Sequence, residues 1–441
     1  MTAYTKSTNF ATKDTLTSGD PLKIVKGTEI NTEFDNIATA VNSKTDIASP
    51  TFTGTVTIPT LAYAGTTLTS AVTGTGKMVL DASPTLVTPI LGTPTSGILT
   101  NCTGIQYNGF KNRIINGGMD ISQRDTSFTS AGSANNDDTY VLDRFYILSD
   151  GNDIIDVTQT TTVPTGAKYS IGLDVETINK KFGIAQIIEN ANCSDAIGGA
   201  VTVSFQAKVS ATTNLDNIKC AIVAWSGTAD TVTSDIISAW NVEGTNPTLI
   251  ANATYENTPA NLNVTTSFAT YSVTANVDTA STSNIILFIW SDVTTTSLGE
   301  FLYITGVQLE KGSTATSFDY RPYGTELGLC QRYLPAYISS SAADQVAGMG
   351  QAANTTAVAF SYTFPMTTRV PPTGISIPDS THFTVSDGVT NTVCTTSSFN
   401  ISGFFSANIQ FNVASGLTQY RAYSLYGSNS AAKILFTGCE L

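Results

Sequence analysis

Apolar residues near the start of the chain recur at a helical spacing. Ile30, Phe34, Ile37 and Val41 follow one another at intervals of four, three and four residues, which predicts an amphipathic helix with a single apolar seam. Thr28 has the chemistry of a residue that caps such a helix at its N-terminus. Because the seam covers barely two heptads, the pattern alone fits both a short coiled coil between chains and a helix packed on a globular neighbour.

Between residues 49 and 106, short apolar fragments alternate with prolines and glycines. Residues 49–59 read SPTFTGTVTIP, and the opening SPT recurs at 83–85. Such fragments cannot bury their apolar side chains within one chain, because proline suits strand edges and turns. The segment is either a flexible linker or a shaft in which several chains intertwine. The regular placement of valine, isoleucine and leucine favours the shaft, with Pro50, Phe52 and Val56 directed inward or staggered across chains.

Residues 107–325 form a long succession of predicted strands, of which 201–209, 218–225 and 285–290 are clear examples. Turn residues separate them at intervals typical of a sandwich. Two packed antiparallel sheets of the jelly-roll type account for this length.

Residues 326–441 open with a predicted helix at 326–333 and then return to strand patterns at 358–364, 409–413 and 420–426. They predict a second, smaller β domain, a C-terminal sandwich at the tip of the molecule. The predicted fold class is therefore all-β: a short N-terminal helix within residues 1–48, a shaft over 49–106, a jelly-roll sandwich over 107–325 and a β tip over 326–441.

The composition supports an ordered, β-rich chain. Of the 441 residues 41% are hydrophobic and only 12% are charged, about half the usual charged share of roughly 25%. The formal net charge of −13 and the lack of a basic patch exclude nucleic acid as a ligand.

Cysteine usage and the N-terminus bear on where the protein is made. The six cysteines lie far apart without a CxxC pair, which predicts free, buried thiols rather than a zinc or redox site; they are Cys102, Cys193, Cys220, Cys330, Cys394 and Cys439. The start of the chain has no signal-peptide pattern, and no stretch approaches 18 consecutive apolar residues. We therefore expect a protein made in a cytoplasm, not exported by the usual route and not inserted in a membrane.

Three segments resemble bacteriophage tail-fibre and receptor-binding proteins. The first is residues 112–124 (NRIINGGMDISQR), followed by DRF at 143–145. The second is residues 304–322 (ITGVQLEKGSTATSFDYRP), followed by LCQRY at 329–333. The third is SPTFTGT at 49–55 in the shaft. The first two bracket a domain similar to the jelly-roll, carbohydrate-binding modules of such fibres, whereas the last hundred residues match no known pattern.

The resemblance implies a homotrimeric virion component, made in the host cytoplasm and released by lysis. Residues 1–48 would attach to other tail proteins, with Ile30, Phe34, Ile37 and Val41 forming the trimer seam of a short coiled coil. The tip would contact a host surface polysaccharide or an outer-membrane receptor. Two alternatives stay open: a short tailspike with glycan hydrolase or esterase activity, and a structural tail adaptor whose tip binds another virion protein.

The sequence gives little support for catalysis. The only histidine, His382, stands three residues after Asp379, a spacing that SGNH-type esterases also show, but their Gly-Asp-Ser nucleophile motif is absent. Acidic pairs that could serve a glycosidase occur without any distinctive spacing. We expect a binding protein, not an enzyme, without a cofactor.

Oxygen-rich loops at 135–138 (NNDD) and 150–153 (DGND) could attract calcium, but neither has the spacing of an EF-hand, and such clusters are usually plain turns. Glycan binding uses flat aromatic faces with a few fixed polar groups. Trp225 and Trp290 end apolar strands and are expected in the core. The candidate ligand-binding residues are instead Trp240, His382, Phe383, Phe404, Phe405, Tyr420, Tyr423 and Tyr426.

Overall fold

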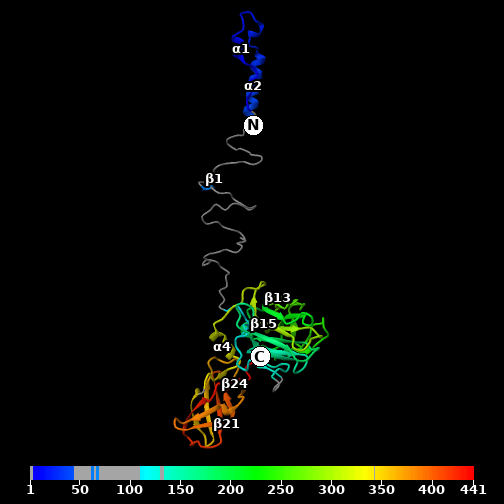
Figure 1. The fold of residues 1–441 in the computed structure, drawn as a ribbon. Helices are drawn as coiled ribbons and strands as arrows, with labels where there is room; N and C mark the ends of the chain where they lie inside the picture. Colours follow the sequence, from blue (N-terminus) through cyan, green and yellow to red (C-terminus); the bar gives the residue numbers. More distant parts are fainter. Residues whose placement is uncertain (1–2, 44–60, 64–65, 69–109, 130–133, 342) are drawn as a thin grey trace. The chain divides into compact units, whose positions relative to one another are not determined.

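The computed structural model describes residues 3–43, 61–63, 66–68, 110–129, 134–341 and 343–441 (Figure 1). The chain divides into two compact units, Met1–Thr103 and Gly104–Leu441, which are described separately. Most of the predicted shaft, including Pro50, Phe52 and Val56, lies outside the described residues, as does Cys102.

The first unit is built around one long helix. Its elements are α1 (Phe10–Asp14), the 3-10 helix η1 (Pro21–Lys23), α2 (Gly27–Asn42) and an antiparallel pair, β1 (Leu61–Tyr63) with β2 (Thr66–Leu68). The predicted helix is present, but its N-cap is Lys26 and not Thr28. The reason is local: the Glu29 carboxylate accepts a hydrogen bond from the Lys26 backbone N–H at 2.9 Å, so the helix begins two residues before the predicted start.

The seam predicted on this helix faces solvent in the single chain. Ile30, Phe34, Ile37 and Val41 are 42%, 64%, 40% and 61% exposed. A flanking side of α2 is occupied: the buried Glu33 carboxylate accepts hydrogen bonds from the hydroxyls of Tyr4 and Ser7, both at 2.6 Å. The coiled-coil and trimer assignments stay predictions.

The second unit opens with the predicted sandwich of two antiparallel sheets. The five-stranded sheet has the order β12-β9-β14-β7-β4, and the six-stranded sheet has the order β13-β8-β15-β6-β5-β3. The strands are β3 (Ser127–Phe128), β4 (Tyr146–Ser149), β5 (Ile155–Thr160), β6 (Ser170–Val175), β7 (Phe182–Ile188), β8 (Ala200–Val209), β9 (Ile218–Trp225), β12 (Ala253–Tyr255), β13 (Ala269–Asn276), β14 (Asn284–Ser291) and β15 (Phe301–Lys311). The predicted strands at 201–209, 218–225 and 285–290 are confirmed.

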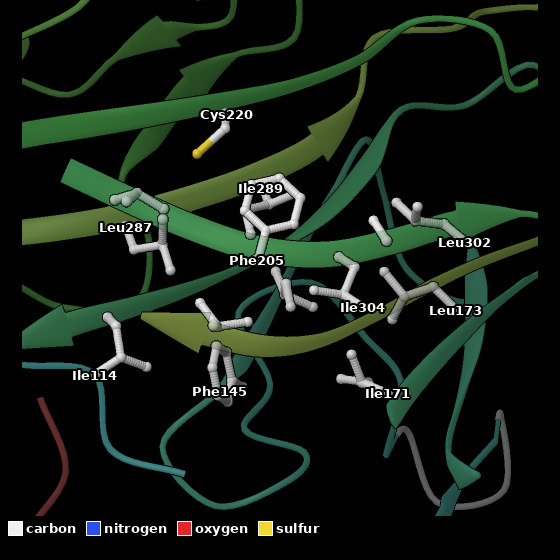
Figure 2. Close-up of a cluster of buried hydrophobic side chains, with 14 of the residues drawn as sticks. Ile114, Phe145, Ile171, Leu173, Phe205, Cys220, Leu287, Ile289, Leu302 and Ile304 are labelled. Atoms are coloured by element: carbon white, nitrogen blue, oxygen red, sulfur yellow. The ribbon is translucent and has the colours of Figure 1, made fainter. Parts of the chain in front are cut away.

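One hydrophobic core fills the space between the two sheets (Figure 2). Phe205, Leu302 and Ile304 enter it from the six-stranded sheet, and Leu287 and Ile289 enter it from the five-stranded sheet. Alternate residues point to opposite faces of a strand, so the neighbours of these residues point to the outer faces of the sandwich. Those outer residues are covered on the five-stranded sheet, whereas a cleft opens over those of the six-stranded sheet.

A second core covers the outer face of the five-stranded sheet. Trp290 and Phe288 stack there with ring centroids 4.4 Å apart. The segment between β9 and β12 packs over them and contains a small hairpin, β10 (Ile237–Ala239) with β11 (Thr248–Leu249). Tyr333 and Leu441, from the last third of the chain, complete this cluster.

The C-terminal region is a closed six-stranded barrel with the order β17-β18-β22-β21-β20-β23, flanked by a three-stranded sheet, β16-β24-β19. The predicted C-terminal sandwich is therefore wrong in architecture, although its strands are present. Register shifts in β17 and β21 bend these strands so that the sheet closes on itself. The remaining elements are α3 (Asn190–Cys193), α4 (Tyr323–Gln331), β16 (Ala336–Ile338), β17 (Asp344–Ala352), β18 (Ala357–Thr363), β19 (Gly374–Ser376), η3 (Ser380–His382), β20 (Phe383–Ser386), β21 (Asn391–Ser402), β22 (Ser406–Val413), β23 (Ala422–Gly427) and β24 (Lys433–Thr437).

Ion pairs and hydrogen bonds fix the sandwich to the barrel region. The Arg332 guanidinium pairs with Glu189 at 2.6 Å, and Arg124 pairs with Glu440. Arg369 donates to the backbone carbonyls of Cys439 at 2.7 Å and Glu440 at 2.6 Å. The Arg124–Glu440 pair and the packing of Leu441 in the second core bring the last residues back to the sandwich.

The five cysteines that the structure describes are free and buried, as predicted. Within the described parts of the chain, no helix is both long and apolar enough to cross a membrane.

Candidate glycan-binding cleft

A cleft of about 620 Å³ opens on the outer face of the six-stranded sheet. Its floor is polar: Gln206 on β8 lies opposite Thr270 on β13 and Thr305 on β15. One wall is the turn at 165–168, and the other is the segment at 316–323. Because Phe205 points into the core, its neighbour Gln206 points into the cleft.

Aromatic side chains line the second wall. The rings of Phe318 and Tyr320 meet edge to face, with centroids 4.8 Å apart. Tyr320 is 64% exposed, and its hydroxyl donates to the carbonyl of Gly166 across the cleft at 3.1 Å. Tyr323, the first residue of α4, is also exposed. Exposed rings above a polar floor match the chemistry of a saccharide site, where sugar faces stack and hydroxyls hydrogen-bond.

Besides the paired Arg321 and Glu326, two charged residues line the cleft, Asp120 and Lys168. Burial raises the pKa of the Asp120 carboxyl, the Lys168 ammonium lowers it, and Glu326 raises it further, with a net upward shift. Lys168 lines the same cleft. The site therefore offers a carboxyl acceptor and an ammonium donor to a polar ligand.

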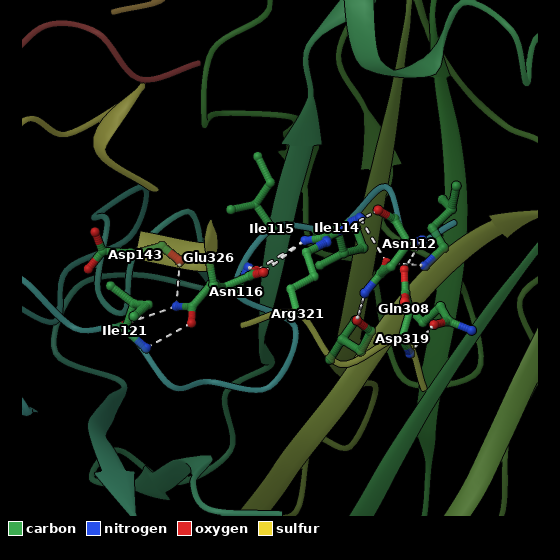
Figure 3. Close-up of polar contacts among 12 residues, drawn as sticks. Asn112, Ile114, Ile115, Asn116, Ile121, Asp143, Gln308, Asp319, Arg321 and Glu326 are labelled. Atoms are coloured by element: carbon green, nitrogen blue, oxygen red, sulfur yellow. Dashed lines mark hydrogen bonds and ion pairs between the residues drawn. The ribbon is translucent and has the colours of Figure 1, made fainter. Parts of the chain in front are cut away.

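The motif at 112–124 forms a largely buried polar scaffold, part of which Figure 3 shows, and its Gly118 and Asp120 line the cleft. The Asn112 amide donates to the carbonyl of Val307 at 3.0 Å, and its oxygen accepts from the backbone N–H of Leu309 at 3.0 Å. The Asn116 side chain closes the following loop, since it donates to the carbonyls of Ile121 at 2.8 Å and Asp143 at 3.0 Å. These contacts tie the loop that carries Asp120 to β15 and to the DRF segment.

The motif at 304–322 reaches the same scaffold from the other side. Arg321 donates to both carboxylate oxygens of Glu326, at 3.1 and 3.0 Å, and to the carbonyl of Ile114 at 3.1 Å. Glu326 in turn accepts a hydrogen bond from the backbone N–H of Asn116. The two segments that resemble tail fibres therefore form one polar network, which positions Phe318 and Tyr320 above the sheet.

Gly117 has a steric role in this network. A Cβ atom there would lie 1.9 Å from the carbonyl oxygen of Val307. Only glycine allows the loop to approach β15 this closely.

The tryptophans lie on the opposite, covered face of the sandwich. Trp225 and Trp290 are in the second core, as predicted. Trp240, proposed as a ligand-binding residue, is half-buried and packs edge to face against Phe288, with centroids 6.0 Å apart. It does not line the cleft.

The aromatic candidates of the C-terminal region do not form one site. Phe383 and Tyr423 are buried in the barrel core, which excludes them from a surface site in this structure. Tyr420 is exposed beside Ala352, to whose carbonyl its N–H donates at 2.8 Å. Phe404 and Phe405 are exposed at the other end of the barrel, where Phe364 donates to the carbonyl of Phe405. Tyr426 is half-buried on β23.

His382 lies on η3 with its Nε2 atom 3.6 Å from the Asp379 carboxylate. Both side chains are partly exposed, and the Asp379 carboxylate also caps η3 by accepting from the N–H of Thr381 at 2.8 Å. In this geometry Asp379 has a structural role in the turn.

The loops considered for calcium are held together by their own hydrogen bonds. The Asn135 amide donates to Asp153 at 2.8 Å and to Asp156 at 3.0 Å, and Asp137 accepts from the N–H of Ser149 at 2.7 Å. Among the residues that the structure describes, no group of three or more acidic, histidine or cysteine side chains is arranged to hold a metal ion.

Comparison with known proteins gives remote structural likenesses only. No family model and no curated protein matches the sequence. Among solved structures, the enzymatically active domain of bacteriophage CBA120 tailspike protein 4 is similar at 16% identity and a TM-score of 0.27, over 46% of this chain and 22% of that one. This chain therefore spans less than a quarter of that tailspike domain.

Two further similar structures have names that refer to sugars. One is a candidate sugar-binding protein from Bacteroides thetaiotaomicron, with 12% identity and a TM-score of 0.28 over 46% of this chain and 100% of that one. The other is a xylan-binding module from Paenibacillus barcinonensis, with 14% identity and a TM-score of 0.23 over 38% of this chain and 87% of that one. Such low scores carry no conclusion about function, which has to come from the geometry of the cleft.

Proposed function

We propose that this chain is an attachment protein of a bacteriophage tail that binds a host surface glycan in the cleft of its sandwich domain. The observation that carries the proposal is the cleft itself, with the exposed Tyr320 and the half-buried Phe318 above a floor of Gln206 and Thr270. A saccharide ring would stack on the tyrosine while its hydroxyls bond to the amide and hydroxyl groups of the floor.

The test is a comparison of two tyrosines in the full chain. Tyr320→Ala removes the ring above the cleft, and Tyr420→Ala removes an equally exposed ring at one end of the barrel. Binding to host polysaccharide, measured by calorimetry, should weaken about tenfold in Tyr320→Ala, which corresponds to about 1.4 kcal/mol. It should stay unchanged in Tyr420→Ala. The reverse result would move the receptor surface to the barrel and overturn the proposal for the cleft.

We propose further that the protein acts as a homotrimer. The exposed seam of Ile30, Phe34, Ile37 and Val41 supports this, because a coiled coil buries such a stripe between chains. The mass in solution, measured by light scattering, should be near three times 46.4 kDa. Phe34→Asp should lower that mass, and a monomeric wild-type chain would refute the assembly.

We expect binding without cleavage. Incubation of the protein with the bound polysaccharide should release neither new reducing ends nor acetate. A release that is lost in His382→Ala would favour the esterase alternative.

A further inference from the structure

Two lysines on the open face of the sandwich have no polar partner. Within the described part of residues 110–441, every arginine and every other lysine side chain donates a hydrogen bond or forms an ion pair, whereas Lys168 and Lys208 do neither. Each ammonium lies beside an aromatic ring, and that of Lys168 also attracts the Asp120 carboxyl without forming an ion pair with it. In a chain with a net charge of −13, two unpaired cations on one face need an explanation.

Both lysines lie where a glycan in the cleft would run. Lys168 lines the cleft itself, and its ammonium is 4.9 Å from the centre of the Tyr169 ring. Lys208 follows Gln206 by two residues on β8 and so points to the same side of the sheet, roughly 7 Å further along the strand. The open face therefore carries a cation within the cleft and another just beyond it.

Flat aromatic surface accompanies the second cation. The Lys208 ammonium lies 5.0 Å from the Tyr303 ring centre and 5.4 Å from that of Phe268. Tyr303 stacks on Phe301 with centroids 5.3 Å apart and planes 7° from parallel. A ring beside an ammonium can hold a sugar face and its charged substituent together.

The other charges near the two lysines are a paired group that lines the cleft and an acidic group, Asp174 with Asp156 and Glu176, on the same sheet near Tyr303. Arg321 and Glu326 neutralise one another in a buried pair. Asp120 lies near enough to Lys168 for the ammonium to lower the pKa of its carboxyl, but the two form no ion pair. Lys208 has no carboxylate within ion-pair distance among the described residues, so its charge is available to a ligand.

We propose that the cleft selects an acidic polysaccharide, whose sugar carboxylates pair with Lys168 and Lys208. This inference rests on the proposed glycan-binding function and adds the substrate class. A carboxylate on one sugar would meet Lys168 in the cleft, and a carboxylate further along the chain would meet Lys208 while its ring lies against Tyr303.

The test uses paired polysaccharides in native gels of the full chain: polygalacturonate and alginate as acidic probes, xylan and mannan as neutral ones. The wild-type protein should be retarded by the acidic probes, less so at high salt because the ion pairs are exposed. The double variant Lys168→Gln/Lys208→Gln should bind the acidic probes about tenfold more weakly, since each exposed pair contributes about threefold. Its binding to neutral probes should not change.

The matched control is Lys180→Gln, which removes the same charge from a lysine already paired with Asp150. An equal loss in this control would show a general charge effect and overturn the assignment of the two lysines. Retardation by neutral probes alone would overturn the acidic class but leave the glycan-binding function intact. No retardation by any probe would count against both.

Discussion

The two outer faces of the sandwich differ in how they meet their surroundings. On the five-stranded sheet every residue of β14 is buried, because the segment between β9 and β12 and the end of the chain cover Phe288 and Trp290. On the six-stranded sheet five of the eight residues of β13 are exposed and only Ala275 is buried, and a polar cleft remains open. In the same layered architecture, one outer face is packed and contributes to stability, while the other is open to a ligand. Substitutions on the covered face should therefore lower the unfolding free energy, and those on the open face should mainly change ligand binding.

The largest loss of stability should come from truncating a side chain that packs on the covered face. Trp290→Ala deletes a fully buried ring that stacks on Phe288. Removal of a buried aromatic side chain costs roughly 3–5 kcal/mol of unfolding free energy, which urea denaturation would measure. Trp240→Ala, at the partly buried edge of the same cluster, should cost less. Equal losses in the two variants would contradict the described packing.

The next effect concerns a buried charge cluster on the covered side. Asp292 is fully buried between Lys181 at 2.5 Å and Lys219 at 2.8 Å. Burial alone would raise the pKa of Asp292, but the hydrogen bonds from the two lysines outweigh it and lower the pKa. Asp292→Ala leaves both buried ammonium groups without their carboxylate, although Lys181 still donates to the Val242 carbonyl and Lys219 to the Asn246 amide oxygen, and should cost about 3 kcal/mol.

Two measurements check this cluster. Asp150→Ala, which breaks the exposed pair with Lys180, should cost less than about 0.5 kcal/mol in the same denaturation experiment. Because the folded pKa of Asp292 is lowered, its contribution is present above the usual aspartate range and is lost only as the pH falls through the lowered value. Stability of the wild type relative to Asp292→Ala should therefore shrink only in strong acid.

On the open face, buried hydrogen bonds hold the loops around the cleft in place, whereas on the covered face apolar packing has this role. Asn116 is fully buried, has a φ of 62°, and makes three side-chain hydrogen bonds. Asn116→Ala should cost about 2–3 kcal/mol and weaken glycan binding, since the loop carrying Asp120 loosens. Asn263→Ala, at an exposed residue with a φ of 53°, controls for the backbone strain alone and should cost about 1 kcal/mol.

The smallest expected effect on stability comes from a carboxyl group on the open face, Asp174. Burial, then Glu176 and Asp156, raise the pKa of Asp174 on the open face to about 6. Its charged form is thus disfavoured in the folded state, and the wild type loses stability as the pH rises from about 4 through about 6. Asp174→Asn should raise stability by about 1 kcal/mol or less at pH 8, after solvent screening, and leave it unchanged at pH 4. Thermal unfolding at both values checks the sign.

The strands of the sandwich could be predicted from the sequence because their patterns are local. The run Ile285–Trp290 is apolar without alternation, and the structure shows why: it is buried on both faces. The sequence does not distinguish the barrel from a sandwich, because closure of the sheet depends on register shifts in β17 and β21, and no pattern of residues predicts these shifts.

The cleft was missed for a related reason. Phe318 and Tyr320 stand within the motif at 304–322, and their alternation in an otherwise polar stretch is the sequence signal that indicates an exposed aromatic pair. Their neighbours in space, Gln206 and Lys168, lie more than a hundred residues away in the sequence. The aromatic candidates chosen at the tip were misleading because strand alternation buried Phe383 and Tyr423.

The return of residues 439–441 to the sandwich has a consequence for how the molecule can be divided. The barrel strands stand in the sequence between the sandwich and Leu441, which fills part of the sandwich's second core. During synthesis that core stays incomplete until the whole barrel has left the ribosome, so the covered face is finished last. A recombinant sandwich cut after residue 334 would expose Trp290's neighbours to water, whereas a fragment that retains residues 110–441 keeps the cover in place.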